Sequence, residues 1–298
     1  MRPRHFSFVV LAATLWGTGG ALGHALARDS AVPSVAVAMW RILLAGLVLA
    51  AVLQVLGRLR LRAVTPAMWR RAGLMAVLLA AFQAAYFAAV DRAGVGLATM
   101  VTIGSSPLAV AAFDVVVRRH RPSARTVAAL ALALAGLAAL TGGAAEAGGG
   151  SHAIAGVGFA LVAGGAFAGV SLVASAAVPE WGGARLTAVA FTGGGLTLLP
   201  LALATGWGVP SGSTGWVLVG ALAVIATAIP HALFNAGLAT VPAVIATIVA
   251  LLEPLVAAAI GVVAFSEPMG PWQITGALAL GSAVVVLRPQ RDAPVPLA

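Results

Sequence analysis

Ten apolar runs, each of about 20 residues, fill nearly the whole chain and leave no room for a sizeable water-facing domain. A membrane-spanning helix needs about 20 mostly apolar residues. Only 8% of the 298 residues are charged, whereas a soluble domain has roughly 25% charged residues. Because so few charges cannot cover a surface in water, the sequence predicts an all-α integral membrane protein.

The runs are unbroken, and they do not alternate between apolar and polar residues as the strands of a membrane barrel do. We therefore expect ten transmembrane helices. The predicted spans are 6–26, 35–56, 67–90, 94–117, 126–142, 153–177, 185–205, 215–238, 242–265 and 271–288. Small residues at helical spacing, Gly19 with Gly23 and Gly165 with Gly169, predict places where two helices approach closely.

The arginines predict the orientation in the membrane, because cytoplasmic loops carry an excess of basic residues. With a cytoplasmic N-terminus, the outside loops hold only Arg28 and Arg92. The inside segments then hold Arg2, Arg4, Arg58, Arg60, Arg62, Arg70, Arg71, Arg118, Arg119, Arg121, Arg125, Arg185, Arg288 and Arg291. We therefore predict a multi-pass protein of the bacterial inner membrane with both termini in the cytoplasm.

Residue types that are missing exclude several functions. The chain has no cysteine and no lysine, so it has no thiolate metal site, no phosphate-binding loop of the Walker A type and no lysine Schiff base. No His-Glu-x-x-His motif occurs. We expect no metal and no cofactor, and an intramembrane enzyme is the least favoured function. The net charge of +9 is explained by the loop arginines, so nucleic acid is not an expected partner.

An internal repeat appears when the sequence is shifted by 147 residues. Phe87 then falls on Phe234, and Pro107-Leu108 falls on Pro254-Leu255 without a gap. We expect a first repeat over 1–147 with helices one to five, a second over 148–290 with helices six to ten, and a cytoplasmic tail at 291–298. Since each repeat has an odd number of helices, the second enters the membrane from the opposite side. Inverted repeats of this kind are typical of secondary transporters.

Several short motifs follow one another along both halves of the chain: Leu15-Trp16-Gly17-Thr18, Met39-Trp40-Arg41, the segment from Ala98 to Pro107-Leu108, Leu251-Leu252-Glu253-Pro254 and Phe265-Ser266-Glu267-Pro268. Together they resemble the EamA family of the drug/metabolite transporter superfamily. The resemblance covers both halves and implies ten helices, two inverted EamA repeats and export of amino acids or other metabolites, as in YddG-type exporters. One feature departs from the family: Glu267 precedes the last helix of the second repeat, but His120 stands at the corresponding turn of the first.

Glu253 is the one carboxylate that the predicted spans place near the middle of the membrane. A charge there is costly unless it is paired, protonated or hydrated. Glu253 therefore binds a substrate ammonium, takes up a proton that drives transport, or serves as a protonated structural carboxyl group.

Pro107 and Pro254 occupy equivalent positions in the two repeats, and Pro230 interrupts another helix. Such prolines mark either helix kinks at the transport site or ordinary packing kinks.

Other polar and aromatic residues are candidates for a substrate cavity. Thr227, His231 and Asn235 follow one another at helical spacing and predict a polar stripe that faces a cavity or another helix. Gln83 and Tyr86 share a helix face, although Tyr86 also suits the membrane interface. Trp16 lies in mid-helix, where its N–H needs a partner. Arg41 either meets a substrate carboxylate or extends outward to the interface.

The favoured function is a secondary transporter that exports small metabolites by alternating access through a central cavity. Amino acids, with aromatic ones among the candidates, are the expected substrate class. The alternatives are a metabolite channel, a lipid flippase or a carrier of another substrate in the same fold. The expected partners are the small-molecule substrate and the lipid bilayer. The oligomeric state is left open, and a monomer is plausible.

Overall fold

A computed structural model describes residues 1–59, 65–141, 151–176 and 182–289, and every regular element in these ranges is a helix. The first half contains α1 (Pro3–Trp16), α2 (Thr18–Asp29), α3 (Ser34–Val55), α4 (Pro66–Val116) and α5 (Ala124–Thr141). The second contains α6 (Ser151–Ser175), α7 (Gly182–Thr205), α8 (Gly212–Ala223), the π-helix η2 (Val224–Ala228), α9 (Ile229–Gly237), α10 (Ala243–Ala250), α11 (Leu252–Phe265) and α12 (Pro271–Leu287). Arg60, Arg62, the 147/148 repeat boundary and the tail at 291–298 lie outside the described residues.

Eight helical stretches in the described chain are long and apolar enough to cross a membrane, compared with the ten spans predicted. Two features account for the difference. The 51-residue α4 contains both the third and the fourth predicted span, and it is kinked at Gly94, whose φ of 76° and ψ of 160° are not helical. The last predicted span, α12, has only 17 residues. The number ten therefore remains a prediction.

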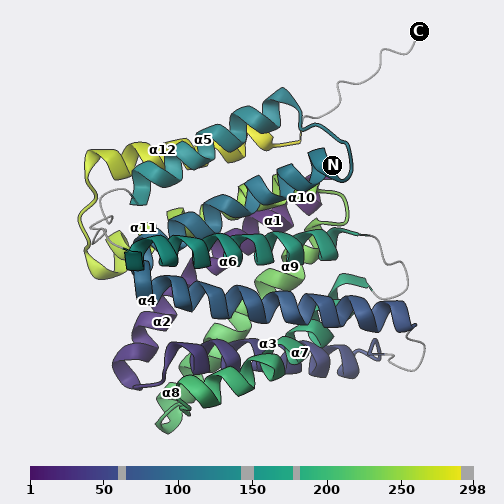
Figure 1. Ribbon diagram of the computed structural model, residues 1–298, viewed down its shortest axis with the longest axis vertical. Coiled ribbons are helices and arrows are strands. Elements are labelled where there is room, and N and C mark those ends of the chain that lie inside the picture. Colours follow the sequence, from purple (N-terminus) through teal and green to yellow (C-terminus); the bar gives the residue numbers. More distant parts are fainter. Residues whose placement is uncertain (60–64, 142–150, 177–181, 290–298) are drawn as a thin grey trace.

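The helices of the two halves interlock rather than form separate bundles. α4 packs on α6, α3 on α7, α5 on α12 and α1 on α9. Each pair contains one helix from the first half and one from the second. Figure 1 shows the consequence: helices far apart in the sequence lie side by side, with α5 and α12 at one edge and α3 with α7 near the other. The start of α1 and the end of α12 lie at the same end of the molecule (Figure 1).

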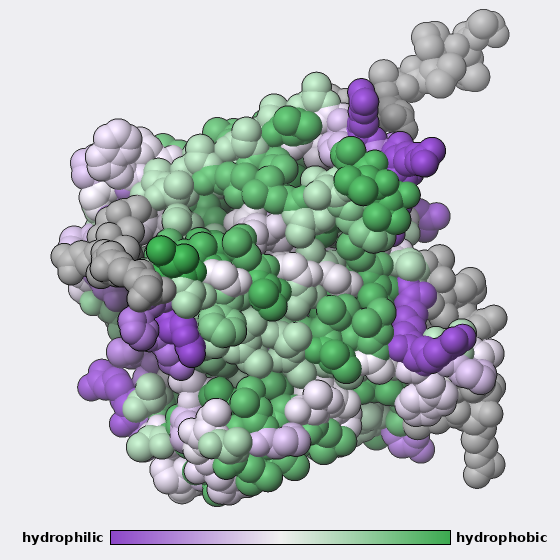
Figure 2. Space-filling view, viewed as in Figure 1, coloured by the Kyte–Doolittle hydropathy of each residue, from purple (hydrophilic) through white to green (hydrophobic). Residues whose placement is uncertain are grey.

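The surface is that of a protein surrounded by lipid. Figure 2 shows apolar residues over the middle of the visible face and hydrophilic residues gathered toward the two ends. Large apolar side chains are mostly exposed on the outside, among them Val55, Ile154, Val217, Val263 and Trp272. An apolar surface of this extent is unusual in a soluble monomer, and it agrees with the low charge content.

Glycines allow the closest helix contacts, and the spacing predicted only some of them. A Cβ built on Gly169 would lie 3.1 Å from the Leu78 side chain and one on Gly19 would lie 3.6 Å from Ala226, whereas within the described residues nothing lies within 4 Å of a Cβ on Gly23 or Gly165. The close approach between α5 and α12 occurs instead at Gly136 and Gly276, where a Cβ on Gly276 would lie 2.6 Å from the Gly136 carbonyl oxygen. Spacing alone cannot tell which face of a helix meets a neighbour.

Candidate functional site

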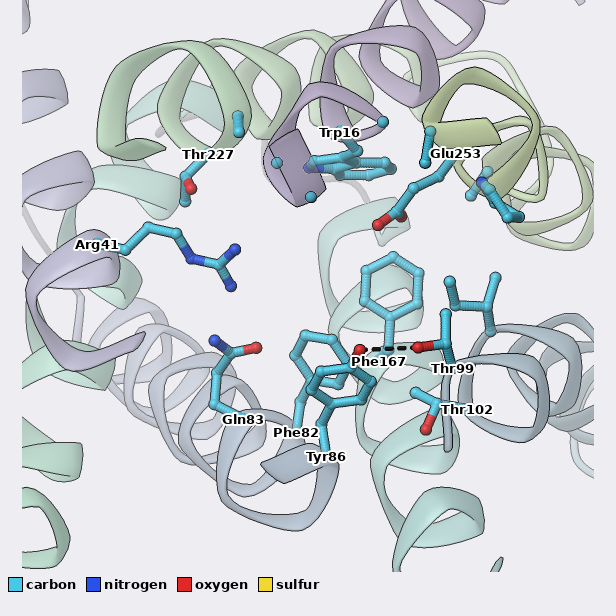
Figure 3. A pocket seen from close by; sticks show the side chains of 18 of the residues that line it. Trp16, Arg41, Phe82, Gln83, Tyr86, Thr99, Thr102, Phe167, Thr227 and Glu253 are labelled. Carbon is cyan, nitrogen blue, oxygen red and sulfur yellow. Dashed lines mark hydrogen bonds between the residues drawn. The ribbon is translucent and has the colours of Figure 1, made fainter. Parts of the chain in front are cut away.

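A cavity of about 400 Å³ lies between the two halves. Its wall includes residues from α1, α2, α3 and α4 of the first half and from α6, η2, α9, α10 and α11 of the second. Figure 3 shows the side chains that point into this space from its different sides. A pocket of this volume suits a small organic molecule.

Three helices are interrupted where they pass the cavity. The α1–α2 helix is interrupted at Gly17, where an added Cβ would lie only 2.9 Å from the Glu253 carbonyl oxygen. The α8–α9 helix contains the π-helical turn η2 just before Pro230, and the α10–α11 helix is interrupted at Leu251, two residues before Glu253. Interruptions of this kind turn polar groups toward a cavity and are frequent at functional sites.

Trp16 and His231 form the polar contact at one side of the cavity. The Trp16 indole N–H donates to His231 Nδ1 at 3.2 Å, and the same Nδ1 lies 2.8 Å from the Thr227 carbonyl oxygen. One ring nitrogen cannot accept from the first group and donate to the second at the same time, so only one of the two bonds is made in either tautomer. Aromatic rings surround Trp16, with Phe167 at 5.9 Å and Phe234 at 5.1 Å between centroids.

Most hydroxyl groups around the cavity already have partners within the protein. The Tyr86 hydroxyl and Thr99 Oγ1 are 2.8 Å apart. Thr102 donates to the Ala160 carbonyl oxygen of α6 at 3.2 Å, and Thr227 donates to the Leu222 carbonyl oxygen at 2.8 Å. These groups are therefore satisfied in the empty cavity.

Arg41 and Glu253 bring opposite charges into the cavity from opposite sides (Figure 3). In the described part of the chain no ion pair within 4.0 Å joins them, and the recorded ion pair is Arg118 with Asp114, at 3.0 Å. Buried side-chain atoms without a hydrogen-bond partner are few among these residues: Arg41 Nε, Gln83 Nε2 and Ser106 Oγ. Two of these three atoms belong to residues that line the cavity.

The structure brings most of the predicted site residues to this cavity. Those at its wall are Trp16, Arg41, Gln83, Tyr86, Thr227, His231, Glu253 and Pro254. Arg41 lies two turns inside α3 and extends into the cavity rather than outward to the interface (Figure 3). Tyr86 also points into the cavity and not to the membrane surface. Whether these residues act on a substrate remains a prediction.

Asn235 does not line the cavity, so the predicted polar stripe is corrected at this residue. It is buried against α7, where its Nδ2 donates to Thr187 Oγ1 at 2.5 Å. Eight residues of α-helix turn by about 80° beyond two full turns, so Asn235 cannot share the face of Thr227.

Pro107 and Pro230 are buried away from the cavity lining. The two equivalent prolines also differ: α4 continues through Pro107, whereas the helix around Pro254 is interrupted.

Sequence reasoning missed the aromatic part of the wall, which includes Phe82, Phe87 and Phe167. Phenylalanine is common in lipid-facing helices, and no periodicity in these segments singles out the three residues. Among the described residues no group of three or more His, Cys, Asp or Glu side chains could hold a metal ion.

Comparisons with known proteins agree with this architecture. The model of the EamA-like transporter family matches the chain twice, over residues 5–142 and 154–288. The uncharacterized transporter YwfM of Bacillus subtilis (strain 168) is 32% identical over 289 residues, which cover 96% of this chain and 94% of that protein. A solved crystal structure superposes with a TM-score of 0.80 over 96% of both chains at 19% identity, a similarity that concerns the fold alone.

The position of Asn235 leads to a prediction about stability. Thr187→Val keeps the side-chain shape but leaves the buried Asn235 amide without its partner, and we expect it to lower the free energy of unfolding by about 1–3 kcal/mol. Thermal unfolding in detergent measures the loss. Thr205→Val on the same helix is the control, because the exposed Thr205 hydroxyl bonds only its own helix. An altered substrate affinity with unchanged stability would instead give Asn235 a role in the cavity.

Proposed function

The chain belongs to the EamA-like transporter family, and from that premise we propose that it exports small metabolites by alternating access through the cavity between its two repeats. The family identifies the chain as a multi-pass membrane transporter of small molecules rather than an enzyme. The direction of transport, the alternating mechanism and the substrate class are the proposed parts.

The proposed topology has ten spans in two inverted repeats. A straight 51-residue helix would be about 76 Å long, far more than the roughly 30 Å of hydrocarbon in a bilayer, so we assign α4 two spans that meet at Gly94. The spans α1–α2, α8–α9 and α10–α11 each contain an interruption, and α12 is the tenth. This assignment agrees with the two termini lying at one end (Figure 1). We propose that this arginine-rich end faces the cytoplasm of a bacterium and that the membrane is the inner membrane.

The two ends of the cavity support alternating access, because one is open and the other is closed. Toward the α2–α3 connection, Val95 lines the cavity and is 63% exposed. Toward the N-terminal end, the path is filled by the buried core residues Phe6, Val9, Phe234, Leu238 and Val241. In the proposed topology this is an outward-open state.

The closed end is held by a close contact between α1 and α9. A Cβ on Gly237 would lie 2.9 Å from the His5 carbonyl oxygen, so glycine is needed for the two helices to meet. Next to it, His5 Nδ1 and Thr240 Oγ1 are 2.8 Å apart. We propose that α1 and α9 separate here when the cavity opens to the cytoplasm.

Alternating access predicts side-specific labelling, and the absence of cysteine in the chain makes every introduced thiol unique. In right-side-out vesicles, Val95→Cys should react with a membrane-impermeant maleimide added outside, while Val241→Cys should be protected. Adding substrate should lower the labelling of Val95→Cys and raise that of Val241→Cys from the inside. Equal labelling of both positions from one side, unchanged by substrate, would indicate a continuous channel instead.

Amino acids are the substrate class that we propose, as in YddG-type exporters. The observation that carries this proposal is the presence of Arg41 and Glu253 on opposite sides of one small cavity. A zwitterion offers a carboxylate to the first group and an ammonium to the second. The aromatic rings around Trp16 leave an apolar part of the wall for a side chain.

Counterflow in liposomes tests this function directly. Purified protein should exchange an external labelled amino acid for the same unlabelled amino acid inside, with saturation and with acceleration by the internal substrate. A channel would not show the acceleration, and a lipid flippase would move labelled phospholipid instead. Failure to exchange any amino acid, with or without a pH gradient, would contradict the proposed substrate class.

Glu253 is the residue that we propose couples transport to protons. It is the acidic residue of the cavity wall, and a carboxylate inside a membrane commonly serves proton transfer. We expect Glu253→Gln to abolish the acceleration of export by an inward proton gradient, and to leave a weakened counterflow, because the amide can still accept a hydrogen bond from the substrate ammonium but no longer pairs with its charge. Glu267→Gln is the control, since Glu267 is exposed and lies outside the cavity wall. Unchanged dependence on the gradient in Glu253→Gln would exclude the coupling role.

A further inference from the structure

Arg41 and Gln83 stand out because both keep a buried N–H group without a partner on the wall of the same cavity. Among the described residues, the buried side-chain atoms that lack a hydrogen bond are Arg41 Nε, Gln83 Nε2 and Ser106 Oγ. Buried polar groups in native proteins are almost always hydrogen-bonded, and an exception calls for an explanation. Two exceptions at one cavity indicate that a ligand provides the hydrogen-bond acceptors for these groups.

We infer that Arg41 and Gln83 together form a carboxylate clamp, and that Gln83 determines the selectivity of the transporter for substrates that carry a carboxylate. This inference rests on the proposed function and adds to it a residue and an orientation of the substrate. Gln83 here is a specificity residue, because its amide is expected to contact the substrate itself.

The two side chains approach the same space from neighbouring sides. Arg41 extends from α3 with its guanidinium group inside the cavity, and Gln83 of α4 directs its amide group toward the same region (Figure 3). Gln83 is only 2% exposed, so water from outside does not satisfy its amide. Guanidinium groups have five N–H donors and no acceptor. A group that meets both side chains must therefore accept several hydrogen bonds, as a carboxylate does.

The remaining polar side chains of the cavity do not compete for this role. Tyr86 is bonded to Thr99, and Thr102 and Thr227 are bonded to backbone carbonyl oxygens. The Trp16 N–H is directed at His231. Among the described residues of the cavity wall, the fully buried side-chain N–H groups that lack a hydrogen-bond partner belong to Arg41 and Gln83.

Glu253 defines the other end of the bound substrate. Its carboxylate enters the cavity from the side opposite Arg41, and no ion pair within 4.0 Å links these two residues in the described structure. A ligand with its carboxylate at Arg41 and Gln83 would direct its ammonium group toward Glu253. The expected orientation follows from the fixed places of the two charges.

Introducing a negative charge at Gln83 tests the clamp. Gln83→Glu provides Arg41 with a resident carboxylate, which takes the place of the substrate carboxylate. In counterflow competition we expect the free amino acid to compete roughly 10-fold to 100-fold less well than with the wild type. The methyl ester of the same amino acid lacks the anion, so its competition should be unchanged or stronger. Gln83→Leu removes one donor and should weaken the free acid alone, by a smaller factor.

Gln54→Glu is the matched control, because Gln54 is exposed near the end of α3 and lies outside the cavity wall. It should behave as the wild type does toward both compounds. A parallel loss of free acid and ester in folded, monodisperse Gln83→Glu and Gln83→Leu would overturn the inference, and so would an unchanged competition by the free acid in both.

The experiment separates this inference from the proposed substrate class. If the wild type exchanges no amino acid, the substrate class fails, and the clamp is then tested by competition of benzoate and benzamide for binding to the purified protein. Binding of benzoate that is lost selectively in Gln83→Glu would support the clamp. Absent binding of benzoate, or equal losses for benzoate and benzamide, would overturn it.

Discussion

Inside a lipid bilayer every backbone N–H and C=O group must find its partner within the protein, and every charge must be paired, hydrated or neutralised. The first requirement explains why the described elements are all helical. The second explains why hydrophilic residues gather toward the two ends of the molecule while the middle of the visible face is apolar (Figure 2). It also makes the exceptions informative: a charged residue that stays inside the membrane has a reason to be there, and Arg41 and Glu253 are two such residues.

Because the two repeats interlock, the charged residues Arg41 and Glu253 come to lie at the same cavity. Neither repeat encloses the cavity alone, since Arg41, Gln83 and Tyr86 come from the first half and His231 and Glu253 from the second. Close helix pairs such as α3 with α7 and α5 with α12 tie the halves into one body, with glycines at the tightest contacts. A cavity lined by both repeats is the arrangement that the proposed alternating access requires.

Interruptions in the helices complete the site. Gly17 allows α1 and α2 to bend against Glu253, and the break at Leu251 ends one helix just before that residue. The π-helical turn η2 brings Thr227 and His231 to the cavity wall. These local departures from the α-helix are costly where lipid surrounds the backbone, and they are tolerated here because protein surrounds them.

The sequence by itself determined the membrane environment, the helical class, the two repeats and most of the polar residues at the cavity, because each depends on local composition or on a match between distant segments. It also pointed to Glu253, since an acidic residue within an apolar run is visible without a structure. The structure alone decided which helix faces meet. Spacing favoured Gly19 with Gly23 and placed Asn235 on the cavity, but packing put Gly136 against Gly276 and buried Asn235 against Thr187. The inward direction of Arg41, the free donors of Gln83 and the aromatic wall with Phe82 and Phe167 were likewise decided by packing. All these features have the same physical reason. The rotation of each helix about its own axis is set by the helices that pack against it, and these helices come from the other half of the chain.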